Sequence, residues 1–161
     1  MEYEELVEER LTHAVIGAFF EVYNTLGFGF LEHVYVMALE RELRDRGHTV
    51  AREVAVRIMY KNEHLSTQRL DMIIDDRLVV ETKSTHQLHS AAIRQLFNYL
   101  KGTNLEVGLL LHFGPEPKFY RQIRKNVQRN ARESGKAQPR ANTREFSVPD
   151  PPNPPHPPPN S

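Results

Sequence analysis

The residues best suited to chemistry are two acids and a lysine in one short segment, Asp71, Glu81 and Lys83. Hard divalent ions such as Mg²⁺ bind oxygen ligands, often one or two carboxylates together with a substrate phosphate. Such an ion polarises the phosphate and lowers the pKa of a bound water. A nearby lysine can orient that water or stabilise developing negative charge. The three residues would therefore suit phosphodiester hydrolysis if the fold brings them together.

A predicted β-hairpin would bring them together. Two expected strands share a tight turn at Asp75-Asp76, and counting back from it places Asp71 opposite either Val80 or Glu81. Side chains alternate between the two faces of a strand, so Glu81 and Lys83 share one face. In the second register Asp71 joins them.

Two interpretations of this hairpin remain open. Acids and lysines are common on exposed strand faces, where the same spacing arises without a function. However, Glu81 follows the apolar run Leu78-Val79-Val80, which indicates a buried position. A buried, ionised carboxylate is costly without a partner or a metal, and this favours the functional interpretation.

The elements that would position these residues follow from hydrophobic periodicity. Apolar residues recur at helical spacing in two early segments, each ended by a glycine, and then alternate as in strands. We expect helices at 6–26 and 31–46, strands at 50–60, 65–74 and 77–83, a helix at 90–101 and a buried strand at 107–113. This order predicts an α/β (α+β) fold, with a mixed sheet of about four strands flanked by helices.

The end of the chain has a different composition. Residues 121–144 are polar and basic, and they are compatible with a helical start. Eight of the eleven prolines then fall between Pro149 and Pro159, and proline can neither continue a helix nor donate to a sheet ladder. We therefore expect one domain at 6–126 and a disordered tail at 127–161.

Two further pairs have helical spacing. Glu32 and Tyr35, in the pattern Gly29-x-x-Glu32-x-x-Tyr35, lie three residues apart at the start of the second helix. Gln95 and Tyr99 lie four residues apart on the later helix. Each pair therefore projects from one helix face. Taken alone, either pair is also typical of an ordinary mixed helix surface.

Together these segments resemble a known family. Residues 29–35 are similar to the signature of the small bacterial GxxExxY proteins, which are assigned to the PD-(D/E)xK nuclease-like superfamily. The resemblance covers 6–126 and continues through Arg69-Leu70-Asp71, Glu81-Thr82-Lys83-Ser84, 95–100 and 107–114. It implies a mixed sheet flanked by helices and a Mg²⁺- or Mn²⁺-dependent nuclease.

The resemblance also implies roles for individual residues. Asp71 and Glu81 correspond to the metal-binding acids, with the Thr82 backbone carbonyl as a further ligand. Lys83 corresponds to the catalytic lysine and Glu32 to an extra helical acid near the metal. Thr82 stands where relatives usually carry an aliphatic residue. The residues expected to support the site or contact the substrate are Gln95, Tyr99, Tyr35 and Arg69.

Composition narrows the class of protein. The formal net charge is zero. There are no cysteines, and their absence excludes disulfides, thiolate metal sites and a cysteine nucleophile. The acidic start lacks a signal-peptide pattern, and no apolar run approaches the roughly 20 residues of a membrane span. We therefore expect a soluble, cytoplasmic protein. A nuclease of the kind that the resemblance implies would act on nucleic acid, and we expect DNA rather than RNA. The sequence leaves a homo-oligomer open.

Two other functions are compatible with the same residues. One is a nuclease-fold binding module without turnover, which would act through the basic and proline-rich end. The other is a two-carboxylate glycosidase using Glu32 and Glu81. The glycosidase ranks last because Lys83 has no natural role in it and the chain has no tryptophan to form a sugar platform.

Overall fold

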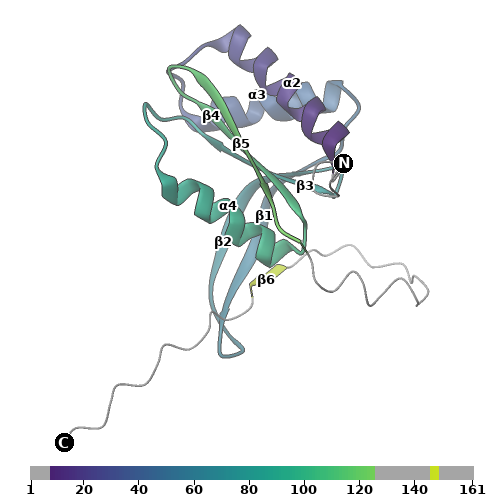
Figure 1. Cartoon of the computed structure of the whole chain (residues 1–161), viewed down its shortest axis with the longest axis vertical. Helices are drawn as coiled ribbons and strands as arrows, with labels where there is room; N and C mark the ends of the chain where they lie inside the picture. The colour runs from purple at the N-terminus through teal and green to yellow at the C-terminus, as the bar shows by residue number, and fades with distance from the viewer. Residues whose placement is uncertain (1–7, 126–145, 149–161) are drawn as a thin grey trace, which may run out of the picture.

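The structure is a computed structural model that describes residues 8–125 and 146–148 (Figure 1). These residues form three helices and six strands. In chain order they are α2 (Glu9–Leu26), α3 (Glu32–Asp45), β1 (Val50–Tyr60), β2 (Glu63–Ile74), β3 (Leu78–Lys83), α4 (Ser90–Thr103), β4 (Val107–Phe113), β5 (Pro117–Ile123) and β6 (Phe146–Val148).

The strands form one mixed sheet in the order β5-β4-β3-β2-β1-β6. β1, β2 and β3 make an antiparallel meander. β4 is parallel to β3, and α4 forms the crossover connection that two successive parallel strands require. The predicted α+β fold with a mixed sheet flanked by helices is confirmed, with two strands more than expected.

The two additional strands lie at the edges of the sheet. β5 pairs antiparallel with β4 in a region where the sequence suggested the start of a basic, partly helical segment. That interpretation was wrong because an edge strand is only half covered and tolerates polar and basic residues. β6 pairs parallel with β1 at Val56–Ile58 and comes from the segment 127–161 predicted to be a tail. The rest of that segment lies outside the described residues.

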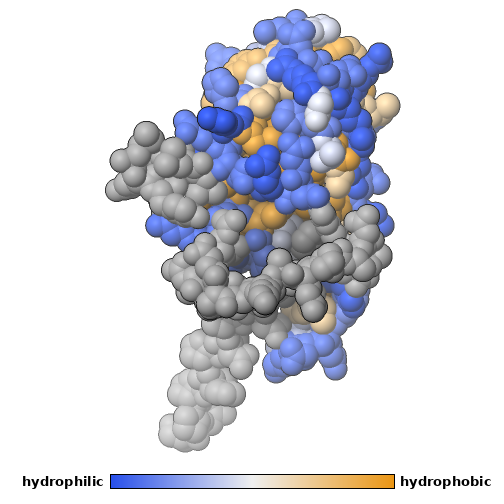
Figure 2. Space-filling model, turned by 90° about the vertical axis from the view of Figure 1, so that its right-hand side faces the viewer, coloured by the Kyte–Doolittle hydropathy of each residue, from blue (hydrophilic) through white to orange (hydrophobic). Residues whose placement is uncertain are grey.

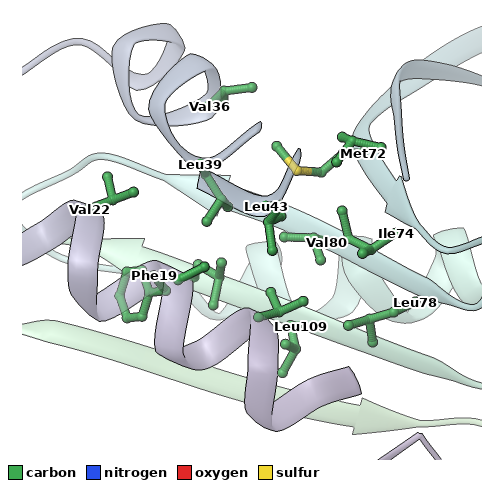
Figure 3. Packing of buried hydrophobic residues seen from close by; sticks show 14 of the residues in the cluster. Phe19, Val22, Val36, Leu39, Leu43, Met72, Ile74, Leu78, Val80 and Leu109 are labelled. Atoms are coloured by element: carbon green, nitrogen blue, oxygen red, sulfur yellow. The ribbon is translucent and has the colours of Figure 1, made fainter. Parts of the chain in front are cut away.

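The two faces of the sheet carry separate hydrophobic cores. Helices α2 and α3 cover one face (Figure 3), and α4 covers the other. β4 packs against both layers, and all seven of its residues are buried, as its continuous apolar run predicted. The core beneath α2 and α3 includes Phe19, Val22, Leu39, Leu43, Met72, Ile74, Leu78, Val80 and Leu109.

The β1–β2 hairpin changes faces partway along its length. Met72 packs under α2 and α3, whereas Leu70, two residues earlier, packs under α4, although regular alternation would place both on one face. The break falls at Asp71 of β2 and Glu53 of β1. These two residues are not paired, although the residues on either side of them are. Glu53 has a φ of 50°, a left-handed conformation that costs energy in a non-glycine residue. Beyond this break the hairpin extends away from the sheet (Figure 1).

The face seen in Figure 2 is mostly hydrophilic, with hydrophobic residues in patches between the polar ones. In residues 8–125 no helix is both long enough and apolar enough to cross a membrane.

Candidate active site

Asp71 and Glu81 lie directly opposite each other on neighbouring strands. The β2–β3 pairing ends at Met72 with Val80, so the next pair outward is Asp71 with Glu81. This is the second of the two registers that the sequence allowed. The strand ladder is replaced there by a side chain, because the Asp71 backbone N–H donates to Glu81 Oε1 at 2.8 Å.

Thr82 holds the Asp71 carboxylate in place. Its backbone N–H and its Oγ1 hydroxyl both donate to Asp71 Oδ2, at 2.8 and 2.9 Å. Thr82 is fully buried, so both bonds are shielded from competing water. This side-chain role was not predicted, because the family resemblance implied only the backbone carbonyl of Thr82 as a ligand.

The surroundings of Glu81 disfavour its ionised form. Its side chain is buried, with 4% of its surface exposed. Burial and then the nearby charge of Asp71 raise the pKa of Glu81 to about 8, against the opposing effects of the Asp71 N–H and Lys83. Two carboxylates this close disfavour simultaneous ionisation. A nearby positive charge would favour the ionised form of Glu81.

Glu32 and Lys83 complete the charged cluster. Burial raises the pKa of Glu32, while Lys83 lowers it, Asp71 raises it and the Ser84 backbone N–H lowers it. These influences place Glu32, at the start of α3, within electrostatic reach of the hairpin residues. The structure thus gathers Asp71, Glu81, Lys83 and Glu32 at one end of β3.

Gln95 and Tyr99 approach the carboxylates from α4. Gln95 Nε2 donates to the Tyr99 hydroxyl at 2.9 Å, and that hydroxyl donates at 3.4 Å to the Arg69 carbonyl, two residues before Asp71. Burial and then the charges of Glu81 and Asp71 raise the pKa of Tyr99 to about 12. The pair thus supports β2 at its break. Arg69 takes part through its backbone, and its side chain is exposed.

Tyr35 supports the site from behind. It is fully buried and stacks on Phe113, with ring centroids 4.2 Å apart. Its hydroxyl donates to the Gly27 carbonyl at 2.5 Å and accepts the Phe30 N–H at 3.2 Å. Tyr35 therefore fixes the connection that leads into Glu32. Because its side chain is fully buried, it does not contact substrate.

The hairpin offers carboxylate and carbonyl oxygens, the type of ligand that Mg²⁺ prefers. Asp71 Oδ1 and Glu81 Oε2 accept no hydrogen bond from the described residues. Thr82 directs its N–H at Asp71. Since the N–H and the carbonyl of a strand residue point to the same neighbouring strand, the Thr82 carbonyl also faces β2. Within the described part of the chain, no three His, Asp or Glu side chains group closely enough to hold a metal. Mg²⁺ suits such a sparse set, since it retains several waters.

A groove of ≈ 580 Å³ runs from Lys83 along α4. Its polar lining includes Gln95 and three residues that the sequence analysis did not identify, Gln68, Arg94 and Asn98. They come from β2 and α4, so no spacing in the sequence joins them to Lys83. No carboxylate lines this groove. A second hollow of ≈ 550 Å³ is lined by Glu8, His48, Asp75 and Arg77 and contains none of the predicted site residues.

Comparison with known proteins identifies the superfamily of the chain. The sequence profile of the PD-(D/E)XK nuclease superfamily matches residues 9–126, so the chain belongs to the PD-(D/E)XK nuclease superfamily. No curated protein matches the chain significantly. A similar solved structure is described as "Crystal structure of SSO0001", with a TM-score of 0.49 and 19% identity. The match covers 76% of this chain and 62% of that one.

Proposed function

We propose that this protein is a Mg²⁺- or Mn²⁺-dependent nuclease that hydrolyses phosphodiester bonds, acting on DNA rather than RNA. Within the superfamily we place it among the GxxExxY proteins, through Gly29, Glu32 and Tyr35. The observation that carries the proposal is the Asp71–Glu81 pair at the break in β2, with Lys83 on the same strand as Glu81.

The metal ligands would be Asp71, Glu81 and the Thr82 carbonyl. A bound ion would polarise the phosphate and acidify the attacking water. The carboxylate oxygens without hydrogen bonds support this assignment. So does the raised pKa of Glu81, because a cation would favour the ionised form that burial opposes.

Lys83 and Glu32 would act beside these ligands. The charge of Lys83 lowers the pKa of both Glu32 and Glu81, so its ammonium group lies within reach of both acids. There it can hold the attacking water or stabilise charge developing on the phosphate. Glu32 would orient Lys83 and add negative potential that attracts the cation.

The groove along α4 would hold the substrate backbone. Lys83 and Arg94 supply positive charge, while Gln68 and Gln95 supply amide donors, which are common partners of phosphate oxygens. The absence of a lining carboxylate favours a polyanion. A neutral net charge is compatible with this, because the acids are concentrated at the metal site.

A nuclease assay tests the proposal. Single- and double-stranded DNA and RNA are incubated with Mg²⁺, Mn²⁺ or a chelator. We expect metal-dependent cleavage of DNA that Asp71→Asn and Lys83→Met abolish. Glu63→Gln, which removes an exposed acid from β2, is the matched control and should cleave normally. Cleavage that survives Asp71→Asn would contradict the proposed site.

A binding module without turnover is the second candidate. The observation that favours it is that Asp71 Oδ2 and Glu81 Oε1 are already occupied by hydrogen bonds from the backbone, so one oxygen per acid is left for a metal. This candidate predicts nucleic-acid binding that is indifferent to Mn²⁺ and no cleavage under any metal. The same assay, combined with binding measurements, separates the two candidates.

A further inference from the structure

The connection between α2 and α3 exposes an unusual set of apolar side chains. We call residues 27–31 the aromatic loop. Phe28 is 44% exposed, Phe30 48% and Leu31 72%. Single exposed apolar residues are ordinary on a protein surface, whereas a contiguous group marks a candidate binding surface.

The backbone of the aromatic loop is held firmly. Gly27 and Gly29 have φ values of 70° and 119°, which glycine adopts without strain. Tyr35 bonds the Gly27 carbonyl and the Phe30 N–H, and Ser84 Oγ donates to the Phe30 carbonyl at 2.7 Å. With these backbone groups satisfied, the rings are presented on a fixed support and little entropy is lost when a ligand binds.

The aromatic loop lies at the rim of the candidate active site. Ser84, which holds Phe30, directly follows Lys83 in the chain. The Ser84 backbone N–H also lowers the pKa of Glu32, the residue after Leu31. Phe28 meets the His86 ring edge-on, with centroids 6.4 Å apart. A strand of nucleic acid bound at Lys83 would therefore pass within reach of the exposed rings.

We propose that the aromatic loop stacks against unpaired bases of single-stranded DNA next to the scissile phosphate, through Phe28 and Phe30. This inference rests on the proposed nuclease function and gives that site a substrate class. Every base has a π-face that can stack on an aromatic ring, but in a duplex those faces are covered by neighbouring bases. The loop would therefore favour single strands, overhangs and frayed ends over intact duplex.

Binding without cleavage tests the inference. Affinities for a single-stranded oligonucleotide and a blunt duplex of the same sequence are measured in chelator, in an Asp71→Asn background. The single strand carries 2-aminopurine, whose fluorescence is quenched by stacking. We expect Phe28→Ala/Phe30→Ala to weaken single-strand binding by at least about fivefold per ring and to abolish the change in 2-aminopurine signal. Duplex binding should change less than twofold.

Two controls separate stacking from general effects. Phe119→Ala removes a similarly exposed ring, 42% exposed, that packs on Phe20 and belongs to β5. This variant should bind like the parent. Phe28→Leu/Phe30→Leu keeps the loop apolar without π-faces and should behave like the alanine variant. Melting temperatures within about 4 °C of the parent confirm that each variant is folded.

The outcomes distinguish this inference from the proposed function. Equal losses on single strand and duplex, or no loss on either, overturn it. So does retained binding in the leucine variant, which would indicate a generic apolar contact. A parent dimer that becomes monomeric in the alanine variant would show that a second copy occupies the loop, and would also overturn it. If wild type cleaves no substrate but the ring-dependent preference persists, the proposed hydrolysis fails and the stacking site stands.

Discussion

The Asp71 carboxylate affects both the ionisation of its neighbour and the hydrogen bonding of the fold. It raises the pKa of Glu81, yet its Oδ2 accepts two hydrogen bonds from Thr82. Asparagine keeps an acceptor oxygen at that position and removes the charge. Asp71→Asn should therefore leave the metal-free protein as stable as wild type or slightly more stable.

The same substitution should abolish stabilisation by metal. A ligand that binds only the folded state stabilises it by RT ln(1 + [L]/Kd), about 1.4 kcal/mol at ten times Kd. Thermal melts of wild type and Asp71→Asn, each in chelator and in millimolar Mn²⁺, measure both effects. A lower melting temperature for the variant in chelator, with no metal shift in wild type, would indicate a structural Asp71 and count against the nuclease proposal.

Thr82→Val isolates the hydroxyl that holds Asp71. Valine keeps the shape and the backbone N–H but loses one buried hydrogen bond, which costs about 1 kcal/mol of unfolding free energy. Residues that orient metal ligands typically affect metal affinity by about 10- to 100-fold. We expect weaker Mn²⁺ binding by titration and slower cleavage, with Thr82→Ser restoring both. Unchanged Mn²⁺ affinity in Thr82→Val would show that the backbone N–H alone positions Asp71.

At the scale of elements, the β2–β3 turn is fixed by Asp75. Asp75 and Asp76 have φ values of 49° and 60°, as in the tight turns of hairpins. The Asp75 carboxylate accepts the Thr49 N–H at 2.8 Å and lies 2.7 Å from His48 Nδ1. The turn is thereby tied to the start of β1, and it sets the register that places Asp71 opposite Glu81.

This arrangement predicts a pH dependence of stability. Burial alone would raise the pKa of Asp75, but the hydrogen bonds from His48 and Thr49 outweigh it and the pKa is lowered. The unfolded chain therefore binds more protons than the folded one as the pH falls below about 4. The contribution of the Asp75 carboxylate to stability is present at neutral pH and is lost as the pH falls through its folded-state pKa. Asp75→Asn should cost about 1 kcal/mol at pH 7 and less at pH 3.

Urea unfolding at both pH values measures the difference. Glu63→Gln, an exposed acid at the start of β2, serves as the control for a general change in charge. If Asp75→Asn and wild type differ equally at pH 3 and pH 7, the carboxylate charge contributes nothing and the turn is held by shape alone.

The elements that could be predicted from sequence are those with a clear period. The apolar face of α2 and the buried run of β4 each carry their own signal. β5 could not be recognised, because an edge strand needs backbone pairing rather than an apolar face. The reversal at Asp71 could not be recognised either. Leu70 and Met72 have the spacing of one strand face, and only the opposing Glu53 conformation separates them.

For the molecule as a whole, the sequence located the acids of the candidate site but not its surroundings. Asp71 and Glu81 share a hairpin, so local register was enough to bring them together. The groove instead joins Gln68 of β2 to Arg94 of α4, and their proximity depends on the crossover of α4. The position of the aromatic loop beside the site could not be predicted either, because it depends on the hydrogen bond from Ser84, which follows β3, to the Phe30 carbonyl.

The C-terminal boundary of the domain can be tested by truncation. Both hydrophobic cores lie within residues 11–120, whereas β6 adds three residues at the edge of β1. We therefore expect truncation after Arg129 to lower the melting temperature by no more than about 4 °C, equivalent to about 1 kcal/mol or less. Truncation after Asp150 removes most of the proline cluster but keeps β6, and it is the matched control. If only the shorter chain melts far lower, β6 is an integral edge strand and the domain extends beyond residue 126. If both do, the proline-rich end itself contributes to the fold.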